Sequence, residues 1–429
     1  MPSIPILRRK SSSVPITIVG LQLTPRSYHE DENYLCLGTS EPDSRSIGAE
    51  LHTVDSKWHI KITFEGLLQP PGAHCLPKKR SERREDFQAL CAQVCFGSIT
   101  LLDDTVTEVV ITLAPGDKQG QLGRLPLLDQ KTEIAVLEDR NQFAAVLQEL
   151  CFRVQEDGSR VLYPPVESGT SLPRRWLSAI KTVDTIRGKV DIVGVVGDIE
   201  NTLVYKQVER PFYEQDDTAD FQQEVENLRL CHDVQHVVHP VAVVVSRNPY
   251  QTSKEETAND PVVIRGVLMK YHPRGTLRDA LKSPAHGGLP WQRWPHQLAR
   301  GLSNLHLRGI AHMDVKPENI VISAGGDAVI IDIGGRGYTW EWLAPEMTGE
   351  MANHPLSRPL QERMQNDIWG FGKILSSMAE NLGDGLEKQQ LLSVAADACT
   401  EDPNARITLS SASIILARLD PTQVSLKGE

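Results

Sequence analysis

The chain lacks the features that mark secreted and membrane proteins. Its 429 residues contain seven cysteines, which are scattered and odd in number; this argues against a disulfide framework and fits a reducing compartment. No apolar run approaches the roughly 20 residues that cross a bilayer. The basic residues within 1–13 are not followed by the apolar stretch of a secretory signal. We therefore expect no membrane partner and a cytoplasmic location.

Positive charge is also scarce. The chain has 45 basic against 56 acidic residues, which gives a formal net charge of −11. Nucleic acids are bound through basic faces that neutralise phosphate, so this composition argues against a nucleic-acid partner. A local basic run at residues 78–84, KKRSERR, is interpreted as a solvated loop or helix start, with a nuclear import patch and a nuclear location as the alternative.

The first part of the chain is expected to be a separate region. Residues 1–13 read as a flexible tail, and residues 14–165 as a mixed α/β region with strands at 16–23, 58–64 and 106–113 and helices at 85–96 and 142–154. Cys91 and Cys95 would then share a helix face, as two small buried residues rather than a metal site. No motif indicates a role for this region, and binding of a partner protein is left open.

From residue 174 the pattern changes. Short strand patterns at 190–196 and 202–207 precede a helix at 219–231, and strand patterns at 237–245 and 262–270 follow it. Helical patterns dominate the remainder, at 291–308, 366–380 and 387–400. The sequence thus predicts a β-rich small lobe at 174–269 and a helical large lobe at 273–429.

Residues 311–332 carry the most informative chemistry. Asp314, Lys316 and Asn319 place a potential base, a cation and an amide within six positions, and Asp332 follows an apolar run. This order resembles the catalytic loop and metal-binding turn of protein kinases, and the KPEN sequence at 316–319 resembles the serine/threonine type. The resemblance implies that Asp314 orients and deprotonates the acceptor hydroxyl and that Lys316 neutralises the transferring phosphoryl group. It further implies that Asn319 and Asp332 bind Mg²⁺, while His312 is structural.

Upstream residues resemble the ATP-binding part of the same family. Lys206, in LVYK at 203–206, resembles the lysine that holds the α and β phosphates, and Glu224 lies 18 positions on, where the family's helix supplies its partner. By the same resemblance Met269 is the gatekeeper. The hinge whose backbone binds adenine is then Lys270, Tyr271 and His272.

Three motifs of the large lobe extend the resemblance, which covers about residues 178–420. Ala344-Pro345-Glu346 resembles the end of the activation segment, and Asp367, in DIWGFG, resembles the aspartate that ties down the catalytic loop. Arg406, in DPNAR, is expected to form a buried ion pair with Glu346.

The chain also departs from the family. No G-x-G-x-x-G precedes Lys206; Gly188 is the lone glycine of the expected turn, and Gly194 and Gly197 are assigned to the next turn. Glycine lets backbone amides approach phosphate, so weak nucleotide affinity is expected. Met313 replaces the catalytic-loop arginine, the segment 332–346 is short, and only 39 positions separate Asp367 from Arg406. Control by phosphorylation of that segment is therefore expected to be absent.

The sequence as a whole predicts an α+β protein with a bilobal protein-kinase-like fold preceded by a mixed α/β region. The expected reaction is transfer of the γ-phosphoryl group of ATP, with Mg²⁺, to serine or threonine hydroxyls of a protein substrate. A pseudokinase, acting as a nucleotide-binding or scaffold module without turnover, is the main alternative, and a small-molecule kinase is a third.

Overall fold

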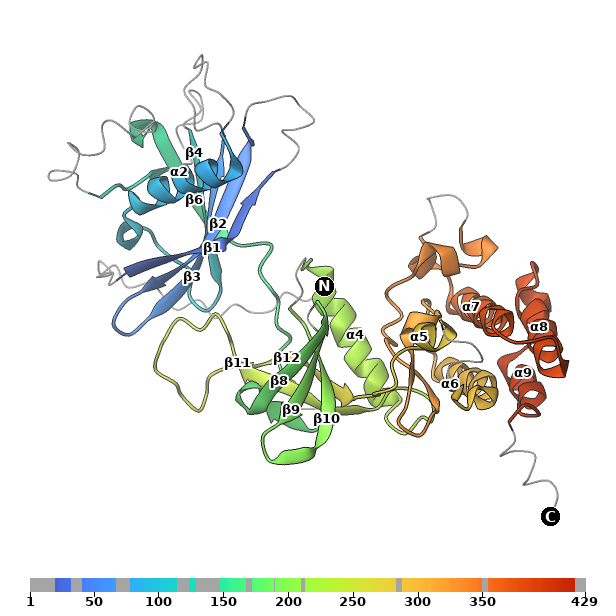
Figure 1. Ribbon diagram of the computed structural model, residues 1–429. Coiled ribbons are helices and arrows are strands. Elements are labelled where there is room, and N and C mark those ends of the chain that lie inside the picture. Colours follow the sequence, from blue (N-terminus) through green and yellow to red (C-terminus); the bar gives the residue numbers. More distant parts are fainter. Residues whose placement is uncertain are drawn as a thin grey trace. The chain divides into compact units, whose positions relative to one another are not determined.

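The computed structural model describes residues 20–31, 41–66, 78–113, 123–128, 147–166, 172–188, 190–209, 213–282, 288–348 and 354–420 (Figure 1). The chain divides into two compact units. The first combines Met1–Arg160 with Arg247–Pro261, and the second combines Val161–Ser246 with Val262–Glu429. The chain therefore passes from one unit to the other at three points.

The first unit is built on a six-stranded sheet in the order β1-β2-β3-β4-β6-β5. Its strands are β1 Gly20–Glu30, β2 Ser44–His52, β3 Lys57–Glu65, β4 Val106–Leu113, β5 Gly123–Arg124 and β6 Leu150–Glu156. Helix α2, Arg80–Ala92, connects the parallel strands β3 and β4 and crosses the sheet (Figure 1). Alternate residues of β2 are buried, as in a sheet with one covered face, and Phe87 and Leu90 of α2 join their core.

Two strand predictions in this unit are confirmed and two helix predictions are corrected. Strands β3 and β4 cover 58–64 and 106–113, and β1 begins at Gly20, with residues 16–19 outside the described range. The helix expected at 142–154 is wrong, because residues from 150 on form β6; residues 142–146 are not described. The apolar spacing there also suits a strand, and antiparallel pairing with β4 decides the outcome. Helix α2 starts earlier than expected and ends at Ala92, so Cys95 lies beyond it.

The segment 247–261 connects two strands of the second unit but is held by the first. Thr252 and Asp104 exchange two hydrogen bonds: the Asp104 amide donates to Thr252 Oγ1 over 2.7 Å, and the Thr252 amide donates to Asp104 Oδ1 over 2.9 Å. The Lys57 amide donates to the Thr252 carbonyl over 2.7 Å. Asn248 Nδ2 donates to the carbonyl of Asp104, whose φ of 59° is left-handed. We call residues 247–261 the docked loop.

The small lobe of the second unit has its own six-stranded sheet, in the order β7-β11-β12-β10-β9-β8. The strands are β7 Arg174–Trp176, β8 Ile180–Arg187, β9 Val190–Val195, β10 Asp198–Gln207, β11 Pro240–Arg247 and β12 Val262–Lys270. One helix, α4 Asp216–Leu230, follows β10. Phe221 and Leu228 of α4 belong to the large core, while a second cluster, which includes Val193, Tyr205 and Leu268, gathers inward-facing residues of the sheet.

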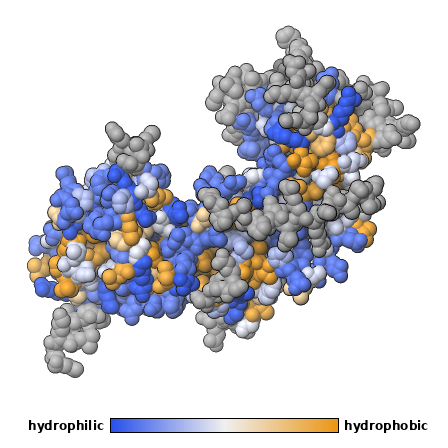
Figure 2. Space-filling model, turned by 180° about the vertical axis from the view of Figure 1, so that it is seen from behind, coloured by the Kyte–Doolittle hydropathy of each residue, from blue (hydrophilic) through white to orange (hydrophobic). Residues whose placement is uncertain are grey.

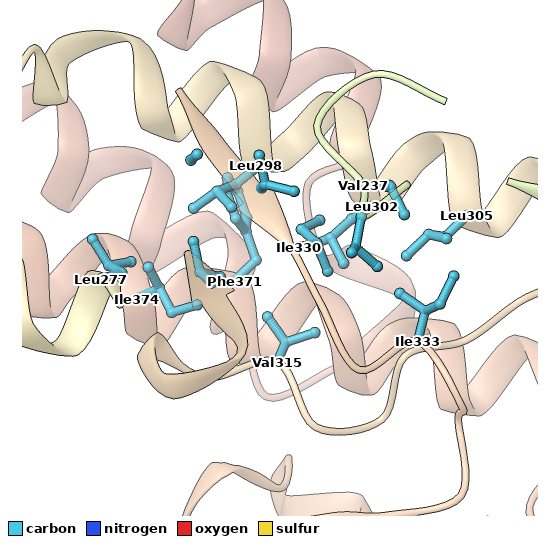
Figure 3. Packing of buried hydrophobic residues seen from close by; sticks show 14 of the residues in the cluster. Val237, Leu277, Leu298, Leu302, Leu305, Val315, Ile330, Ile333, Phe371 and Ile374 are labelled. Carbon is cyan, nitrogen blue, oxygen red and sulfur yellow. The ribbon is translucent and has the colours of Figure 1, made fainter. Parts of the chain in front are cut away.

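The large lobe is helical, as the sequence predicts. Its helices are α5 Leu277–Leu281, α6 Trp294–Leu307, α7 Leu360–Glu380, α8 Leu386–Ala398 and α9 Leu409–Leu416, and its two short strands are β13 Ile320–Ile322 and β14 Ala328–Ile330. Leu298, Leu302 and Leu305 recur at helical spacing on α6 and lie around Ile330 of β14 (Figure 3). Phe371 of α7 enters the same core. This packing fixes β13 and β14, the strands that Asn319 precedes and Asp332 follows in the chain.

No helix within the described residues is long and apolar enough to cross a membrane. On the face shown in Figure 2, hydrophilic residues cover much of the described surface, and hydrophobic residues form patches between them.

Candidate active site

The loop from Ala311 to Asn319 is held in place by a buried carboxylate. Asp367, on α7, accepts hydrogen bonds from the amides of His312 and Met313, each over 2.7 Å. Met313 has a φ of 68°, a strained conformation for a side chain of this kind. His306 of α6 approaches the same carboxylate, with 2.9 Å between Nε2 and Asp367 Oδ2. Residues of the two helices α6 and α7 thus fix the geometry of the loop. The contact of His306 with Asp367 was not predicted from the sequence.

The polar residues predicted in this loop lie together. Lys316 Nζ is 2.6 Å from Asp314 Oδ2. Asn319 Nδ2 donates to the backbone oxygen and to Oδ2 of Asp314, both over 2.9 Å. Asp314 Oδ1 is buried and has no hydrogen-bond partner among the described residues. One carboxylate oxygen of Asp314 therefore has no donor within the part of the chain that the structure describes.

His312 links this loop to the segment before Asp332. Its Nε2 is 2.8 Å from the carbonyl oxygen of Ile331, and its Nδ1 accepts from the amide of Asp314 over 3.2 Å. Both contacts are compatible with one tautomer, in which Nε2 carries the proton. The structural part predicted for His312 corresponds to this position between the two segments.

Lys206, on β10, joins the small lobe to the large one. Its Nζ forms an ion pair of 2.7 Å with Glu224 of α4 and a second, shorter ion pair with Asp332. Burial lowers the pKa of Lys206, but the two carboxylates raise it more, so the pKa lies above its ordinary value. The lysine is therefore positively charged in the folded protein. Lys206 and Asp332, which come from different lobes, are thus in direct contact.

Asn227 is a second residue that the sequence did not reveal. It lies about one helical turn after Glu224 on α4 and is buried. Its Nδ2 donates to the carbonyl of Ile333 over 2.7 Å. Helix α4 is thereby attached to the turn that carries Asp332, whose φ of 63° is left-handed. The one sequence feature that could have pointed to Asn227 is its spacing of three residues from Glu224, which places both on one face of the helix.

A cleft of about 420 Å³ lies between these groups. Its lining comes from both lobes: Gly188, Val190, Lys206, Gln207, Asp220, Glu224, His312, Asp314, Asp332, Gly334, Gly335, Arg336 and Gly337. The expected hinge residues Lys270, Tyr271 and His272, and the expected gatekeeper Met269, are not among them. Met269 is buried on β12 opposite Val204, and the expected role of all four stays a prediction.

His272 has an unusual environment. Burial, then the charges of Lys270 and His239, lower its pKa to about 4. Neither ring nitrogen has a hydrogen-bond partner among the described residues. The ring is therefore neutral near pH 7.

Apolar contacts hold the segment that follows Asp332. Met313 is buried in a cluster with Ala311, Leu343, Ala344 and Met347. Here a methionine side chain occupies the position where the family resemblance implies an arginine. Lys316 Nζ donates to Thr339 Oγ1 over 2.5 Å, which ties the same segment to the catalytic loop.

The expected ion pair of the large lobe is present. Arg406 donates from Nη1 and Nη2 to the two carboxylate oxygens of Glu346, over 2.6 and 2.8 Å. Its remaining donors reach the carbonyls of Thr400 and Gln365. The guanidinium is buried, while the Glu346 side chain is one-quarter exposed, so the pair is buried on one side only.

The residues fit a magnesium ion that is completed by substrate. Asp332 offers a carboxylate oxygen at the cleft, and Asn319, which does not line the cleft itself, is hydrogen-bonded to Asp314, which does. Mg²⁺ prefers one or two carboxylate or amide oxygens together with phosphate oxygens. Within the described ranges no group of three or more His, Cys, Asp or Glu residues could hold a metal ion. The arrangement suits an ion that arrives with a phosphate ligand better than a permanent metal centre.

The fold and cleft define an α+β protein with two lobes around a charged site. Residues 188–390 match the family model described as protein kinase domain. Mitogen-activated protein kinase kinase kinase 17 of Arabidopsis thaliana is 31% identical over 135 residues, which are 30% of this chain and 36% of that protein. Serine/threonine-protein kinase mos of Xenopus laevis is 32% identical over 116 residues, 27% of this chain and 29% of that protein.

The chain therefore contains a protein kinase domain, and its distant relatives are serine/threonine kinases. The matches span about a third of the length of these curated relatives. The family match begins at Gly188, so of the first unit it spans only the docked loop, residues 247–261.

Proposed function

We propose that the second unit is an ATP- and Mg²⁺-dependent kinase that phosphorylates serine or threonine hydroxyls of a protein substrate. The observation that carries this proposal is the assembled cleft. Lys206, paired with Glu224 and Asp332, and Asp314, with one carboxylate oxygen unpartnered, line the same cavity. Phosphoryl transfer depends mainly on positioned charges rather than on covalent chemistry. A lysine for the phosphates, a carboxylate for the acceptor hydroxyl and a carboxylate for the metal are the groups that it needs.

Each residue has a part in the proposed reaction. The Lys206 ammonium, held by Glu224, binds phosphate oxygens of the nucleotide. Asp314 orients the acceptor hydroxyl and takes its proton at the free Oδ1. Lys316, 2.6 Å from Asp314, offsets negative charge on the phosphoryl group as it moves to the acceptor oxygen.

Magnesium would be held by Asn319 and Asp332. When bound, it neutralises charge on the phosphates and orients them for transfer. To bind the ion, Asp332 would give up part of its ion pair with Lys206. Glu224, the second partner of Lys206, would keep the lysine in position.

A pseudokinase is the second candidate, and one observation favours it. The β8–β9 hairpin brings a single glycine, Gly188, to the cleft, with a φ of 55°, and its pairing is irregular at two places. Fewer backbone amides can then approach phosphate closely. The complete set of Lys206, Glu224, Asp314 and Asp332 favours the enzyme. The protein substrate is not specified by the residues described, nor is a partner for the first unit.

Turnover is tested on the full chain. Autophosphorylation and phosphorylation of a general protein substrate are measured with MgATP for the wild type, Asp314→Asn and Asp332→Asn. Asp384→Asn is the control, because Asp384 is a fully exposed aspartate paired only with Lys388 in the described contacts. Loss of activity in the first two variants and retention in the control is the expected result. Activity that survives both cleft changes would refute the assignment.

Nucleotide binding separates the two candidates from other functions. A bound ligand raises stability by RT ln(1 + [L]/Kd), so a thermal shift at millimolar MgATP is expected. A shift without any turnover would favour the pseudokinase. No shift and no turnover would refute the active kinase and favour a pseudokinase that acts as a scaffold without binding nucleotide.

A further inference from the structure

The segment after Asp332 has a composition that the kinase resemblance does not account for. Residues 334–337 are GGRG, and all four line the cleft beside Lys206 and Asp332. The opposite wall, the β8–β9 hairpin, contributes Gly188 and Val190. Glycine in this molecule is therefore concentrated on the large-lobe side of the cleft.

Gly335 shows why glycine is required there. Its φ is +66°, and an added Cβ would lie 2.7 Å from the backbone oxygen of Ala311. A side chain would thus both strain the backbone and collide with the start of the catalytic loop. The close approach of Gly335 to the backbone of Ala311 keeps the neighbouring Arg336 at the cleft.

The Arg336 side chain is loosely held. Its Nε is 3.6 Å from Asp220 Oδ1 on α4, which is too far for a hydrogen bond, and the two side chains are 51% and 31% exposed. Ion pairs of this kind contribute little to stability. The guanidinium can therefore leave Asp220 for a stronger anion at small cost.

The charged residues that line the cleft are mainly acidic, so a phosphate ligand would need an additional cation there. The lining contains the carboxylates of Asp220, Glu224, Asp314 and Asp332. Two lining residues are basic. Lys206 is already engaged by two carboxylates at short distances, and Arg336 has the longer and more exposed ion pair. A triphosphate entering this cleft meets mainly negative groups unless metal and arginine offset them.

We propose that Arg336, presented by the GGRG segment, is a phosphate-binding residue of the nucleotide site and replaces in part the missing glycine-rich loop. A planar guanidinium donates two parallel hydrogen bonds to a phosphate, which makes it a strong substitute for backbone amides. This proposal rests on the proposed nucleotide-binding function. It adds a phosphate-binding residue that belongs to the large lobe and is not part of the family motifs.

The test compares phosphate-bearing and phosphate-free ligands on the full chain. Binding of MgATP and of adenosine is measured by calorimetry and thermal shift for wild type, Arg336→Ala, Arg336→Lys and Asp220→Ala. Arg229→Ala is the matched control, an arginine of α4 that is 39% exposed, pairs with Glu226 and does not line the cleft. Arg336→Ala is expected to weaken MgATP binding about tenfold or more, in line with the loss of a charge-assisted bidentate contact, without changing adenosine binding.

The other variants decide what Arg336 does. Arg336→Lys is expected to restore part of the MgATP affinity, and Asp220→Ala to leave it equal or tighter, because it frees the arginine. If Asp220→Ala weakens MgATP binding as much as Arg336→Ala, the arginine only positions α4 and the proposal is overturned. Unchanged MgATP binding in Arg336→Ala overturns it too but leaves the kinase assignment standing. A wild type that binds no MgATP would defeat the kinase assignment and this proposal together.

Discussion

Lys206 and Glu224 lie 18 residues apart in the chain and meet in an ion pair of 2.7 Å. The pair connects strand β10 to helix α4, and the same lysine reaches Asp332 beyond it. The Lys206 ammonium is therefore held by two carboxylates, one on α4 and one in the turn at Asp332. The position of α4 therefore decides whether Lys206 can face the cleft.

Glu224→Gln tests that dependence. The amide keeps the shape but removes the charge, so Lys206 should move toward Asp332, which then competes less well for metal. We expect the KM for MgATP to rise at least several-fold and kcat to fall, while the fold is retained. Steady-state kinetics against MgATP concentration check this. Kinetics equal to wild type would show that the ion pair has no part in catalysis.

Met313→Arg tests the apolar cluster in the catalytic loop. The change places a charge in the apolar cluster formed by Ala311, Leu343, Ala344 and Met347; the nearby Asp367 carboxylate is already bonded to the amides of His312 and Met313. We expect a loss of about 3 kcal/mol or more in the free energy of unfolding, as for other unpaired buried charges. Denaturant unfolding measures it. Met313→Leu, a volume-conserving swap, should cost less than about 1.5 kcal/mol.

Arg406→Ala tests the ion pair with Glu346. Removing one partner of a buried pair costs roughly 3–5 kcal/mol, and we expect the lower end because Glu346 is partly exposed. Chemical denaturation of the single variants and of the double variant with Glu346→Gln gives the coupling energy. Additive effects would show that the two side chains do not stabilise each other.

His272 should make stability depend on pH. Its pKa is about 4 in the folded protein and near 6.5 when unfolded, so between these values the unfolded state binds more protons. The contribution of His272 therefore destabilises the fold progressively as the pH falls through that window. Lys270 and His239, which lower this pKa, add to the effect. Thermal melts of His272→Gln from pH 7 to pH 4 should show a weaker loss than wild type; an equal loss would contradict the assignment.

Thr252→Val tests the docked loop. It removes the hydroxyl that accepts from the Asp104 amide, leaving a partly buried donor without its partner. We expect a loss of about 1–3 kcal/mol in the unfolding of the first unit. Ser253→Ala is the neighbouring control, since Ser253 is exposed. Hydrogen exchange at residues 53–57 reads out the effect locally, and unchanged protection there would argue that the loop is not held by Thr252.

From the sequence, the charged residues at the centre of the site were easier to predict than the residues that hold them in position. Asp314, Asn319 and Asp332 could be singled out because the family motifs that they resemble restrict both residue type and spacing. Their metal and phosphate roles stay predictions. Asn227 and His306 escaped notice because each acts through a contact to a distant backbone or carboxylate, which many polar residues on a helix could make. Spacing alone does not distinguish these from exposed polar residues.

The first unit was predicted less well, for a different reason. Residues 150–154 carry apolar side chains whose spacing suits a helix or a strand, and only the pairing of β6 with β4 settles which one forms. Residues 251–260 are polar and charged, a composition typical of an exposed loop. Thr252, however, is buried, because its partner Asp104 comes from a part of the chain nearly 150 residues away.

The docked loop means that the border of the kinase domain is not a single point in the chain. A protein shortened to begin at residue 161 would keep residues 247–261 but lose every group of residues 53–104 that satisfies their amides and carbonyls. Conversely, a fragment ending at residue 160 would lack one piece of its own surface. Exchanging this kinase domain for another would therefore require re-engineering the connection between β11 and β12, which no alignment of catalytic motifs would bring to notice.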